Sequence, residues 1–120
     1  MIEITRLEAS HVLRVCLKGV QSAAEFEALG SSLPDTDAQR KLRILFDWTS
    51  LQGFDDRRSF DLSCRRWRQT AGSIARAAIV HQHRWDHYAA LLAAVLRVQG
   101  VQVRSWPVRD HAQALVWLIR

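Results

Sequence analysis

Two nearly all-apolar segments, residues 42–48 and 74–80, constrain the fold of this chain most strongly. Each has the length of a strand, and continuous apolar runs of this length are typical of parallel strands that are covered on both faces. The residues between them, from Asp56 to about Thr70, carry apolar side chains at helical spacing. A strand, a helix and a second strand predict a right-handed βαβ unit and therefore an α/β fold.

The residues before this unit predict a hairpin and a helix. Residues 2–7 and 12–17 alternate apolar and polar side chains on either side of a turn signal at 8–10. So short a connection allows only antiparallel pairing of the two strands. Ser22 and Glu25 then form the capping-box pattern that begins a helix.

The residues after the unit predict a helix from about Arg84 to Val98, a strand at 101–106, and a final helix capped by Asp110 with Ile119 on its core stripe. The predicted order is ββαβαβαβα. It describes a single five-stranded mixed sheet, with an N-terminal antiparallel hairpin and the remaining strands parallel, flanked by four helices. We expect residues 1–120 to form one domain, because a chain of 120 residues can bury a core of its own.

Composition excludes several classes of protein. Hydrophobic residues make up 48% of the chain and charged residues 24%, which is typical of a folded globular chain and argues against disorder. No uncharged stretch approaches the roughly 20 residues needed to cross a bilayer, and the first residues lack the pattern of a signal peptide. We therefore expect a cytoplasmic protein in which Cys16 and Cys64 are reduced, because their spacing does not suit a disulfide framework.

The net charge of +5 does not by itself indicate a nucleic-acid-binding protein. Arginine supplies 15 of the 17 basic residues, and these arginines are spread over nearly every segment. Nucleic-acid recognition needs basic residues that gather on one face or helix. Nucleic acid is therefore not the expected partner.

Three segments and the element order resemble the SpoIIAA-like family, a branch of the STAS fold that sulfate transporters share with anti-sigma factor antagonists. The segments are ILFDWTSLQGFDD, AAIVHQHRW and VQVRSWPVRDHAQALVWL. The resemblance covers essentially the whole chain, and members of this branch are small bacterial proteins. It implies a STAS-like fold, similar to that of CRAL-TRIO lipid carriers, and a role in binding or regulation rather than catalysis.

The resemblance also indicates which residue stands at the regulatory position of anti-sigma factor antagonists. Anti-sigma factor antagonists carry a phosphorylatable serine directly after an aspartate at the start of the second helix. Alignment on the step Asp47-Trp48-Thr49 puts Asp55 on the family aspartate and Asp56 on the phosphoacceptor. An aspartate has a fixed negative charge and no hydroxyl. The resemblance therefore implies that a kinase and phosphatase switch does not operate here.

The charged residues of this helix start have two interpretations. The aspartates either cap the helix, whose dipole favours acids at this end, or present a fixed acidic surface to a partner. The arginines that follow form either a solvated face, with Asp61 and Arg65 as an i,i+4 pair, or a basic surface for anionic lipid or nucleic acid. The predicted partner-binding surface contains Asp55, Asp56, Arg57, Arg58 and Arg65.

A second candidate site lies at the predicted C-terminal ends of three consecutive parallel strands, where open α/β sheets bind ligands. Three of the five tryptophans fall there, and large aromatic residues at such positions either pack in the core or line an apolar cleft. The predicted ligand-binding residues are Trp48, Thr49, His81, His83, Trp85 and Trp106.

Motifs for metal binding and catalysis are not expected to operate. His83 and His87 are four residues apart, as on one helical face, but the HExxH glutamate and a thiolate pair are missing. The sequence has no Gly-rich phosphate loop, no GxSxG elbow and no convincing nucleophile with a base. Cys16 and Cys64 fall on a strand face and a core stripe, which suits inert thiols. We therefore predict no metal, no cofactor and no enzymatic activity.

The leading hypothesis is a non-enzymatic regulatory or protein-interaction module of STAS or SpoIIAA-like type, which lacks the usual phosphoacceptor serine and binds an unidentified protein partner. The alternative is a carrier or sensor of a small apolar or lipid-like ligand, bound at the C-terminal ends of the parallel strands. A homodimer is compatible with both hypotheses.

Overall fold

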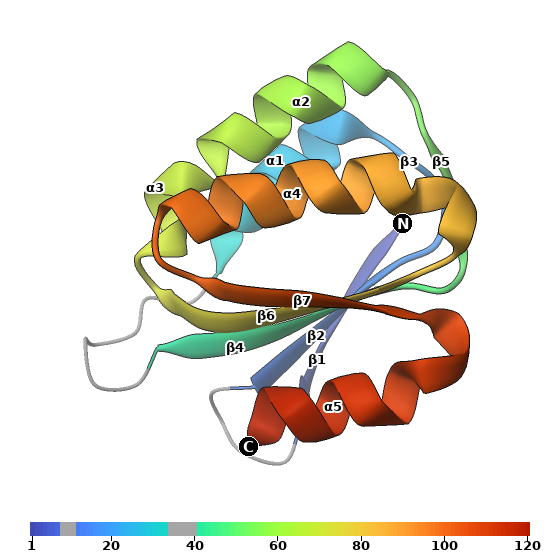
Figure 1. The fold of residues 1–120 in the computed structure, drawn as a ribbon. Coiled ribbons are helices and arrows are strands. Elements are labelled where there is room, and N and C mark those ends of the chain that lie inside the picture. The colour runs from blue at the N-terminus through green and yellow to red at the C-terminus, as the bar shows by residue number, and fades with distance from the viewer. Residues whose placement is uncertain (8–11, 34–40) are drawn as a thin grey trace.

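The computed structural model describes residues 1–7, 12–33 and 41–120. A five-stranded sheet runs through it (Figure 1), formed in spatial order by β1 (Ile2–Leu7), β2 (Val12–Leu17), β4 (Leu42–Trp48), β6 (Ile74–His81) and β7 (Gln102–Pro107). The first two strands pair antiparallel, and the other neighbours pair parallel. The predicted mixed sheet is confirmed, while the turn predicted at 8–10 lies outside the described residues.

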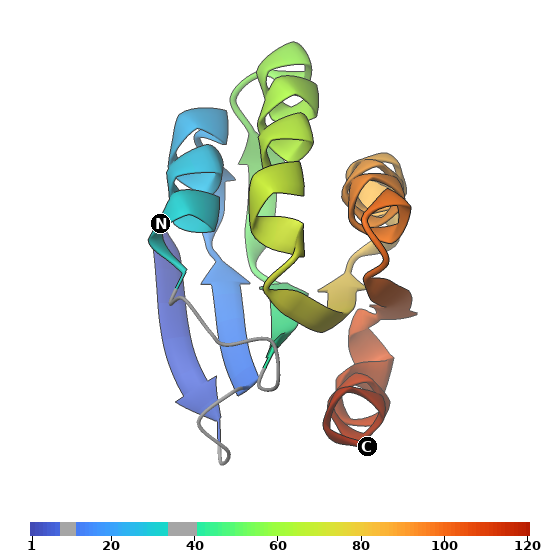
Figure 2. The same ribbon diagram turned by 90° about the vertical axis from the view of Figure 1, so that its left-hand side faces the viewer.

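The helices divide unequally between the two faces of this sheet. Four lie on one face: α1 (Ala23–Ser32), α2 (Arg57–Arg66), α3 (Arg68–Ala71) and α4 (Asp86–Val98). Of the described helices, α5 (His111–Ile119) alone lies on the other face, where it packs against β4, β6 and β7. Figure 2 shows that none of the described helices covers β1 and β2 on that face.

One predicted helix is interrupted in the structure, and another begins two residues later than predicted. The helix predicted from Asp56 to about Thr70 is divided at Trp67, whose N–H is shared between the carbonyls of Ser63 and Cys64. The helix predicted from Arg84 starts instead at Asp86, because residues His83–Trp85 form a short 3₁₀ turn, η1. The predicted helices are therefore present with altered boundaries.

A small second sheet was not among the predicted elements. β3 (Gly19–Gln21) and β5 (Leu51–Phe54) pair parallel beside the main sheet. Gly19 has a φ of 69°, a left-handed conformation that glycine adopts without steric cost. This bend turns the chain out of β2 and lets it pair with β5. Strands this short carry too few residues to show a hydrophobic period.

The core has two parts, one on each side of the sheet. The larger part, beneath α1 to α4, is rich in aromatic rings that include Phe26, Phe46, Trp48, Phe60 and Trp67. The smaller part lies under α5 and contains Val12, Leu45, Ala78, Val80, Trp106, Ala114 and Leu118. β4 and β6 contribute side chains to both parts, which confirms the prediction that these two strands are covered on both faces.

Two predictions about the last helix were only partly right. Asp110 occupies the N-cap position of α5 as predicted, but it also ends a 3₁₀ turn, η2 (Val108–Asp110), and its side chain makes no capping hydrogen bond. Ile119, predicted on the core stripe, is 44% exposed because α5 ends there and the sheet beneath it is already covered by Leu118. No helix in the described part of the chain is long and apolar enough to span a membrane.

Candidate functional site

The two aspartates at the start of α2 serve two different helices. The Asp56 carboxylate accepts hydrogen bonds from Arg58 N–H at 3.1 Å and from Ser59 Oγ at 2.8 Å. These bonds, the one from Ser59 first, hold the pKa of Asp56 below its usual value. Asp55 Oδ1 accepts a hydrogen bond at 3.1 Å from the N–H of Ala23, the first residue of α1. The predicted capping role is therefore present, and Asp55 caps a helix remote in sequence.

A groove between α2 and α4 contains three of the five predicted partner-binding residues. Its volume is about 600 Å³, and its lining consists of Asp56, Arg57, Arg58, Asp61 and Leu91. Asp55 does not line the α2–α4 groove. Arg65 lies one turn beyond Asp61 and pairs with it at 3.4 Å, as predicted from their spacing. Leu62 follows Arg58 at i+4 and is 54% exposed.

The six predicted ligand-binding residues do not lie together. Trp48 is fully buried among Phe26, Phe54 and Phe60 on the α1 to α4 side of the sheet. Its indole N–H has no hydrogen-bond partner within the described ranges. Trp48 is therefore a core residue, which was the alternative interpretation of the tryptophans.

Trp85 lies on the same side of the sheet as Trp48, over β5. Its indole N–H donates to the Leu51 carbonyl at 3.2 Å, and the Arg84 guanidinium lies 4.7 Å from its ring centroid. Thr49 stands apart, since its N–H donates to Asp47 Oδ1 and its carbonyl accepts from the Gln82 side chain. Neither Trp85 nor Thr49 lines the cavity formed by the remaining three residues.

That strand-end cavity has a volume of about 260 Å³ and is lined by His81, His83, Asp86, Ser105, Trp106 and Pro107. His83 Nδ1 lies 2.7 Å from Asp86 Oδ2, and His81 Nδ1 lies 2.9 Å from the Gln82 carbonyl oxygen. No three His, Cys, Asp or Glu side chains in the described ranges are placed to hold a metal ion. The strand-end cavity thus combines four polar side chains with the apolar surfaces of Trp106 and Pro107.

A buried acid on the α5 side of the sheet, Asp47, was not among the predicted site residues. Asp47 lies on β4 facing α5, where Arg14 of β2 donates to its carboxylate and His111 Nε2 lies 3.6 Å away. Burial raises the pKa of Asp47, but hydrogen bonds from Thr49 and Arg14 outweigh burial and leave this pKa below its usual value. The available signal was the one acid in a central strand that is apolar apart from Arg43 and Asp47.

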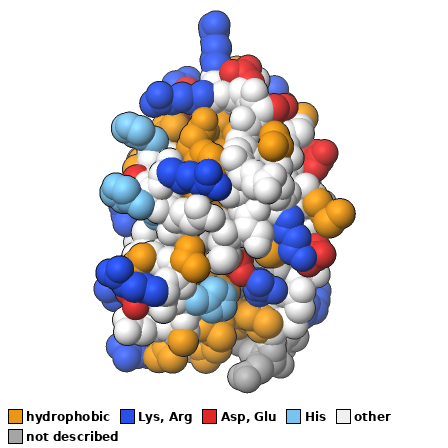
Figure 3. Space-filling view, turned by 90° about the vertical axis from the view of Figure 1, so that its right-hand side faces the viewer, with side chains coloured by type: hydrophobic (Ala, Val, Ile, Leu, Met, Phe, Trp, Pro, Cys, Tyr) orange, Lys and Arg blue, Asp and Glu red, His pale blue; other side chains and the backbone are white. Residues whose placement is uncertain are grey.

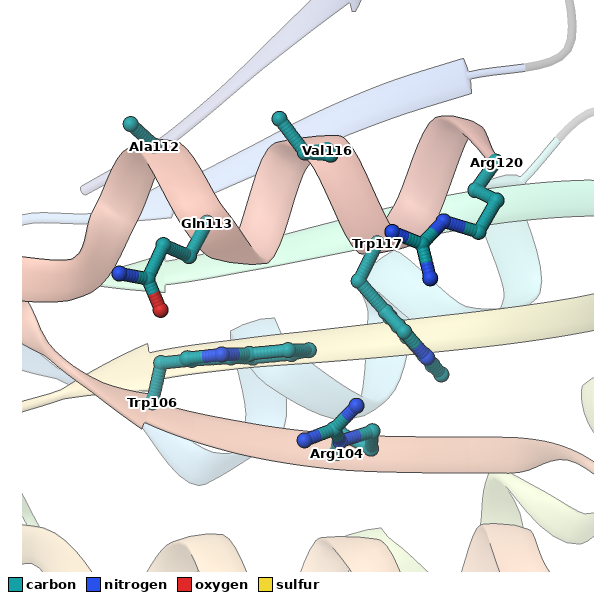
Figure 4. Close-up of a pocket in the computed structure, with 7 residues that line it drawn as sticks. All are labelled: Arg104, Trp106, Ala112, Gln113, Val116, Trp117 and Arg120. Carbon is teal, nitrogen blue, oxygen red and sulfur yellow. The ribbon is translucent and has the colours of Figure 1, made fainter.

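A further cavity lies between β7 and α5, with a volume of about 370 Å³ (Figure 4). It was not among the predicted sites, although Trp106, which lines it, was a predicted ligand-binding residue. Two indoles and two guanidinium groups surround it. Its lining consists of Arg104, Trp106, Ala112, Gln113, Val116, Trp117 and Arg120. We call it the tryptophan–arginine cavity.

Basic residues do not form one continuous surface on the face that Figure 3 shows. Lys and Arg side chains are scattered over it, with hydrophobic and acidic side chains between them. Scattered cations on this face lack the continuous track that a phosphate backbone follows.

The mixed five-stranded sheet in this order, with helices on both faces, is the fold of a STAS-type domain. The chain belongs to the SpoIIAA-like family, whose model matches residues 12–119. This finding confirms the family resemblance seen in the sequence.

A solved structure supports the same fold. It is the crystal structure of an uncharacterised protein from Shewanella loihica PV-4, from a domain family of unknown function with a SpoIIAA-like fold. The two chains are 22% identical, with a TM-score of 0.65, and the alignment covers 98% of this chain and 92% of the other. At this identity the likeness shows the fold alone. No curated protein matches the chain.

Proposed function

We propose that this chain is a non-enzymatic STAS-type module that binds a protein partner in the α2–α4 groove. The observation that carries this function is the groove itself, which coincides with the predicted surface at Asp56, Arg57 and Arg58. STAS-type domains are generally binding modules, and this chain has a complete STAS-type fold. The groove combines charged side chains with apolar Leu91, and exposed Leu62 lies on the same helix as its charged residues, a combination typical of interaction surfaces.

The charges around the groove indicate the chemistry of the partner. Both acids are engaged within the chain, Asp56 by the first turn of α2 and Asp61 by Arg65. The guanidinium groups of Arg57 and Arg58 are exposed and have no ion-pair partner among residues 1–7, 12–33 and 41–120. The groove therefore suits a partner segment that carries a carboxylate beside an apolar side chain.

Charge reversal in the groove tests this function. The double variant Arg57→Glu, Arg58→Glu turns the unpaired cations into anions, so an acidic partner segment should be repelled. The tagged protein is expressed in its source cell, cross-linked and captured, and co-purifying proteins are quantified by mass spectrometry. We expect at least one protein to be lost roughly tenfold with this variant, on the order of 1.4 kcal/mol in binding.

The matched control is Arg68→Glu, an exposed arginine on α3 outside the groove. It makes half the change in net charge without altering the groove, so it should retain the same partner. Thermal unfolding of all three proteins checks that the variants are folded. The function is overturned when every captured protein responds equally to the groove variant and to the control.

The strand-end cavity supports a second candidate function, a carrier or sensor of a small ligand. It brings together His81, His83 and Trp106, three of the predicted ligand-binding residues. Native mass spectrometry of protein purified from its own host measures occupancy directly. A bound mass that disappears in Trp106→Leu would support a carrier. An empty chain with unchanged tryptophan fluorescence in the presence of lipid vesicles would exclude it.

A further inference from the structure

We propose that the tryptophan–arginine cavity between β7 and α5 binds a planar aromatic ring that carries an anionic group. This site goes beyond the function proposed above, because it lies on the opposite face of the sheet from the α2–α4 groove and shares no residue with it. It takes its residues from one edge strand and from the single helix that covers this face.

The apolar part of the cavity suits a flat ring. The centroids of Trp106 and Trp117 are 5.3 Å apart and their planes are inclined by 53°, so the two indoles form a corner rather than a closed stack. Ala112 and Val116 of α5 also belong to the lining of the cavity. The volume of about 370 Å³ is within the range of small-molecule sites. Inclined indoles leave ring faces and edges for contact with a third aromatic ring.

The polar part of the cavity suits an anion. The Arg104 guanidinium carbon lies 5.0 Å from the Trp106 ring centroid and 5.9 Å from that of Trp117, which holds the cation over both indoles. A cation–π contact uses the face of the guanidinium group and leaves its N–H donors, which lie in the plane, free to bind oxygen.

No acid competes for these donors. The seven lining residues include no Asp or Glu, and no carboxylate in the described part of the chain forms an ion pair with Arg104 or Arg120. The Gln113 side chain points toward Trp106 and adds an amide to the same opening (Figure 4). A carboxylate or phosphate on the ligand would thus meet a positioned, unpaired cation.

Two kinds of small molecule share this chemistry, namely aromatic carboxylic acids and nucleoside monophosphates. The experiment follows the indole N–H signals of the five tryptophans in ¹H–¹⁵N spectra, assigned with single Trp→Phe variants. The probes are 2-naphthoate, adenosine monophosphate and the neutral 2-naphthylmethanol. We expect the anionic probes to shift the signals of Trp106 and Trp117 and to leave those of Trp48 and Trp67 unchanged.

The three probes separate the sources of the ligand. Tighter binding of 2-naphthoate indicates an aromatic acid, and tighter binding of adenosine monophosphate indicates a nucleotide. The neutral probe should bind roughly tenfold more weakly than 2-naphthoate, because it lacks the charge that pairs with Arg104.

Arg104→Gln keeps a side chain over the indoles and removes the cation, so the affinity for the anionic probe should fall roughly tenfold. The matched control is Arg109→Gln, an exposed arginine of η2 that does not line the cavity. Thermal unfolding confirms that both variants are folded. The site is overturned when millimolar anionic probes leave Trp106 and Trp117 unshifted, when the neutral probe binds equally well, or when Arg104→Gln binds like the parent. None of these results bears on the α2–α4 groove.

Discussion

Asp47 illustrates how a single charged residue is kept inside this protein. Its side chain is almost fully buried, and an isolated ionised carboxylate would be costly there. Arg14 donates to one of its oxygens and Thr49 N–H to the other. The carboxylate therefore stays ionised and links β2, β4 and the residues that follow β4.

The variant Asp47→Asn should reveal this link as a pH-dependent loss of stability. The pKa of Asp47 is lower in the folded protein than in the unfolded chain, so its ionised form stabilises the fold above about pH 4, and this contribution is lost as the pH falls through the folded-state pKa. At pH 7 we expect a loss of roughly 2 kcal/mol in the free energy of unfolding.

Urea titrations of parent and Asp47→Asn at pH 7 and pH 3 measure the effect. The difference between the two proteins should narrow at pH 3, because this pH is below the unfolded-state pKa of about 3.9 and the ionised carboxylate contributes less there. A difference of the same size at both pH values would contradict the role assigned to the ionised carboxylate.

The two cysteines should be chemically silent in the folded protein. Both thiols are buried. Burial, assisted by Asp61, raises the pKa of Cys64 to about 12, so roughly 0.01% of this thiol is ionised at pH 8. Burial and then Asp47 raise the pKa of Cys16. A thiol-reactive chromogenic disulfide at pH 8 should label neither residue until denaturant is added. Rapid labelling of the native protein would contradict this prediction.

Residue-scale prediction from the sequence succeeded where the interaction is local. The Ser22 cap was predicted, and Ser22 Oγ accepts from Glu25 N–H at 3.3 Å. The Asp61–Arg65 pair was predicted from its i,i+4 spacing and is present. The hydrogen bond from Ala23 N–H to Asp55 joins residues 32 positions apart in the sequence. The residues around either position do not indicate that the two would meet.

Among the elements, the contact between α1 and α2 depends on a glycine inside a helix. A Cβ on Gly30 would lie 3.1 Å from Cε2 of Trp67. Trp67 cannot easily yield, because it is buried, stacks on Phe26 and donates its indole N–H to the Phe26 carbonyl. Glycine is therefore required here for close approach, although it is a poor helix former.

Two glycine variants separate these effects. Gly30→Ala should destabilise the protein by about 1–2 kcal/mol through overpacking against Trp67. Gly72→Ala should stabilise it by about 0.5 kcal/mol, because Gly72 has right-handed helical angles and open space around the added Cβ. Thermal or urea unfolding measures both changes. Stabilisation by both variants would show that Trp67 can move.

The end of α5 is anchored by arginines from the sheet. Arg43 Nη1 of β4 donates to the carbonyls of Leu118 at 2.9 Å and Ile119 at 2.7 Å. Arg76 Nη1 of β6 donates to the Trp117 carbonyl at 2.9 Å. These cations satisfy carbonyls that a helix end leaves unpaired and complement its negative dipole. They also explain why charged residues interrupt two otherwise apolar strands.

Arg43→Met keeps the apolar stem and removes the donors. It should lower the free energy of unfolding by about 1–2 kcal/mol. Lys41→Met, an exposed residue just before β4, is the matched control and should have little effect. Urea unfolding compares the two variants, and equal stability of both would contradict the anchoring role.

Element prediction from the sequence followed the strength of the hydrophobic period. The long strands matched closely, with 42–48 predicted and Leu42–Trp48 observed. β3 and β5 were missed because three or four residues show no period and because their pairing joins distant segments. The break at Trp67 also has no local signal, since the apolar stripe continues through it.

For the whole molecule, the two sides of the sheet differ in how much they bury. In α4, Ala89, Leu92, Ala93 and Leu96 are buried, whereas in α5 only Ala114 and Leu118 are. Elements with fewer buried apolar contacts open at lower free energy than the global unfolding transition. The α5 side is therefore the weaker half of the structure.

Native-state hydrogen exchange should show this difference. Amides of α5 are expected to exchange through a partial opening, at a lower free energy than those of β4, β6 and α4. The free energy of opening measured from α5 amides should fall less steeply with urea concentration than that from β4 amides, because a partial opening exposes less surface. If the α5 amides exchange only through global unfolding, the prediction that the α5 side is less stable than the α4 side is wrong.

The global arrangement also explains why the predicted ligand site did not assemble. Strand ends were placed correctly in sequence, but a shift of one residue in register moves a side chain to the other face of a sheet. Trp48 is aligned with His81, whereas Trp106 is aligned with Val80. The two tryptophans therefore face opposite sides, and no local pattern fixes that register.

The cap at Asp56 has a consequence for how this family can change over time. Serine and aspartate are nearly equal as N-cap residues, so either can begin α2 with its side chain bonded to the first turn, as Asp56 is here. An exchange between them alters whether the position can accept a phosphoryl group while leaving folding almost unaffected. A hydroxyl at this position can thus be gained or lost through sequences that all fold, with no compensating substitution elsewhere.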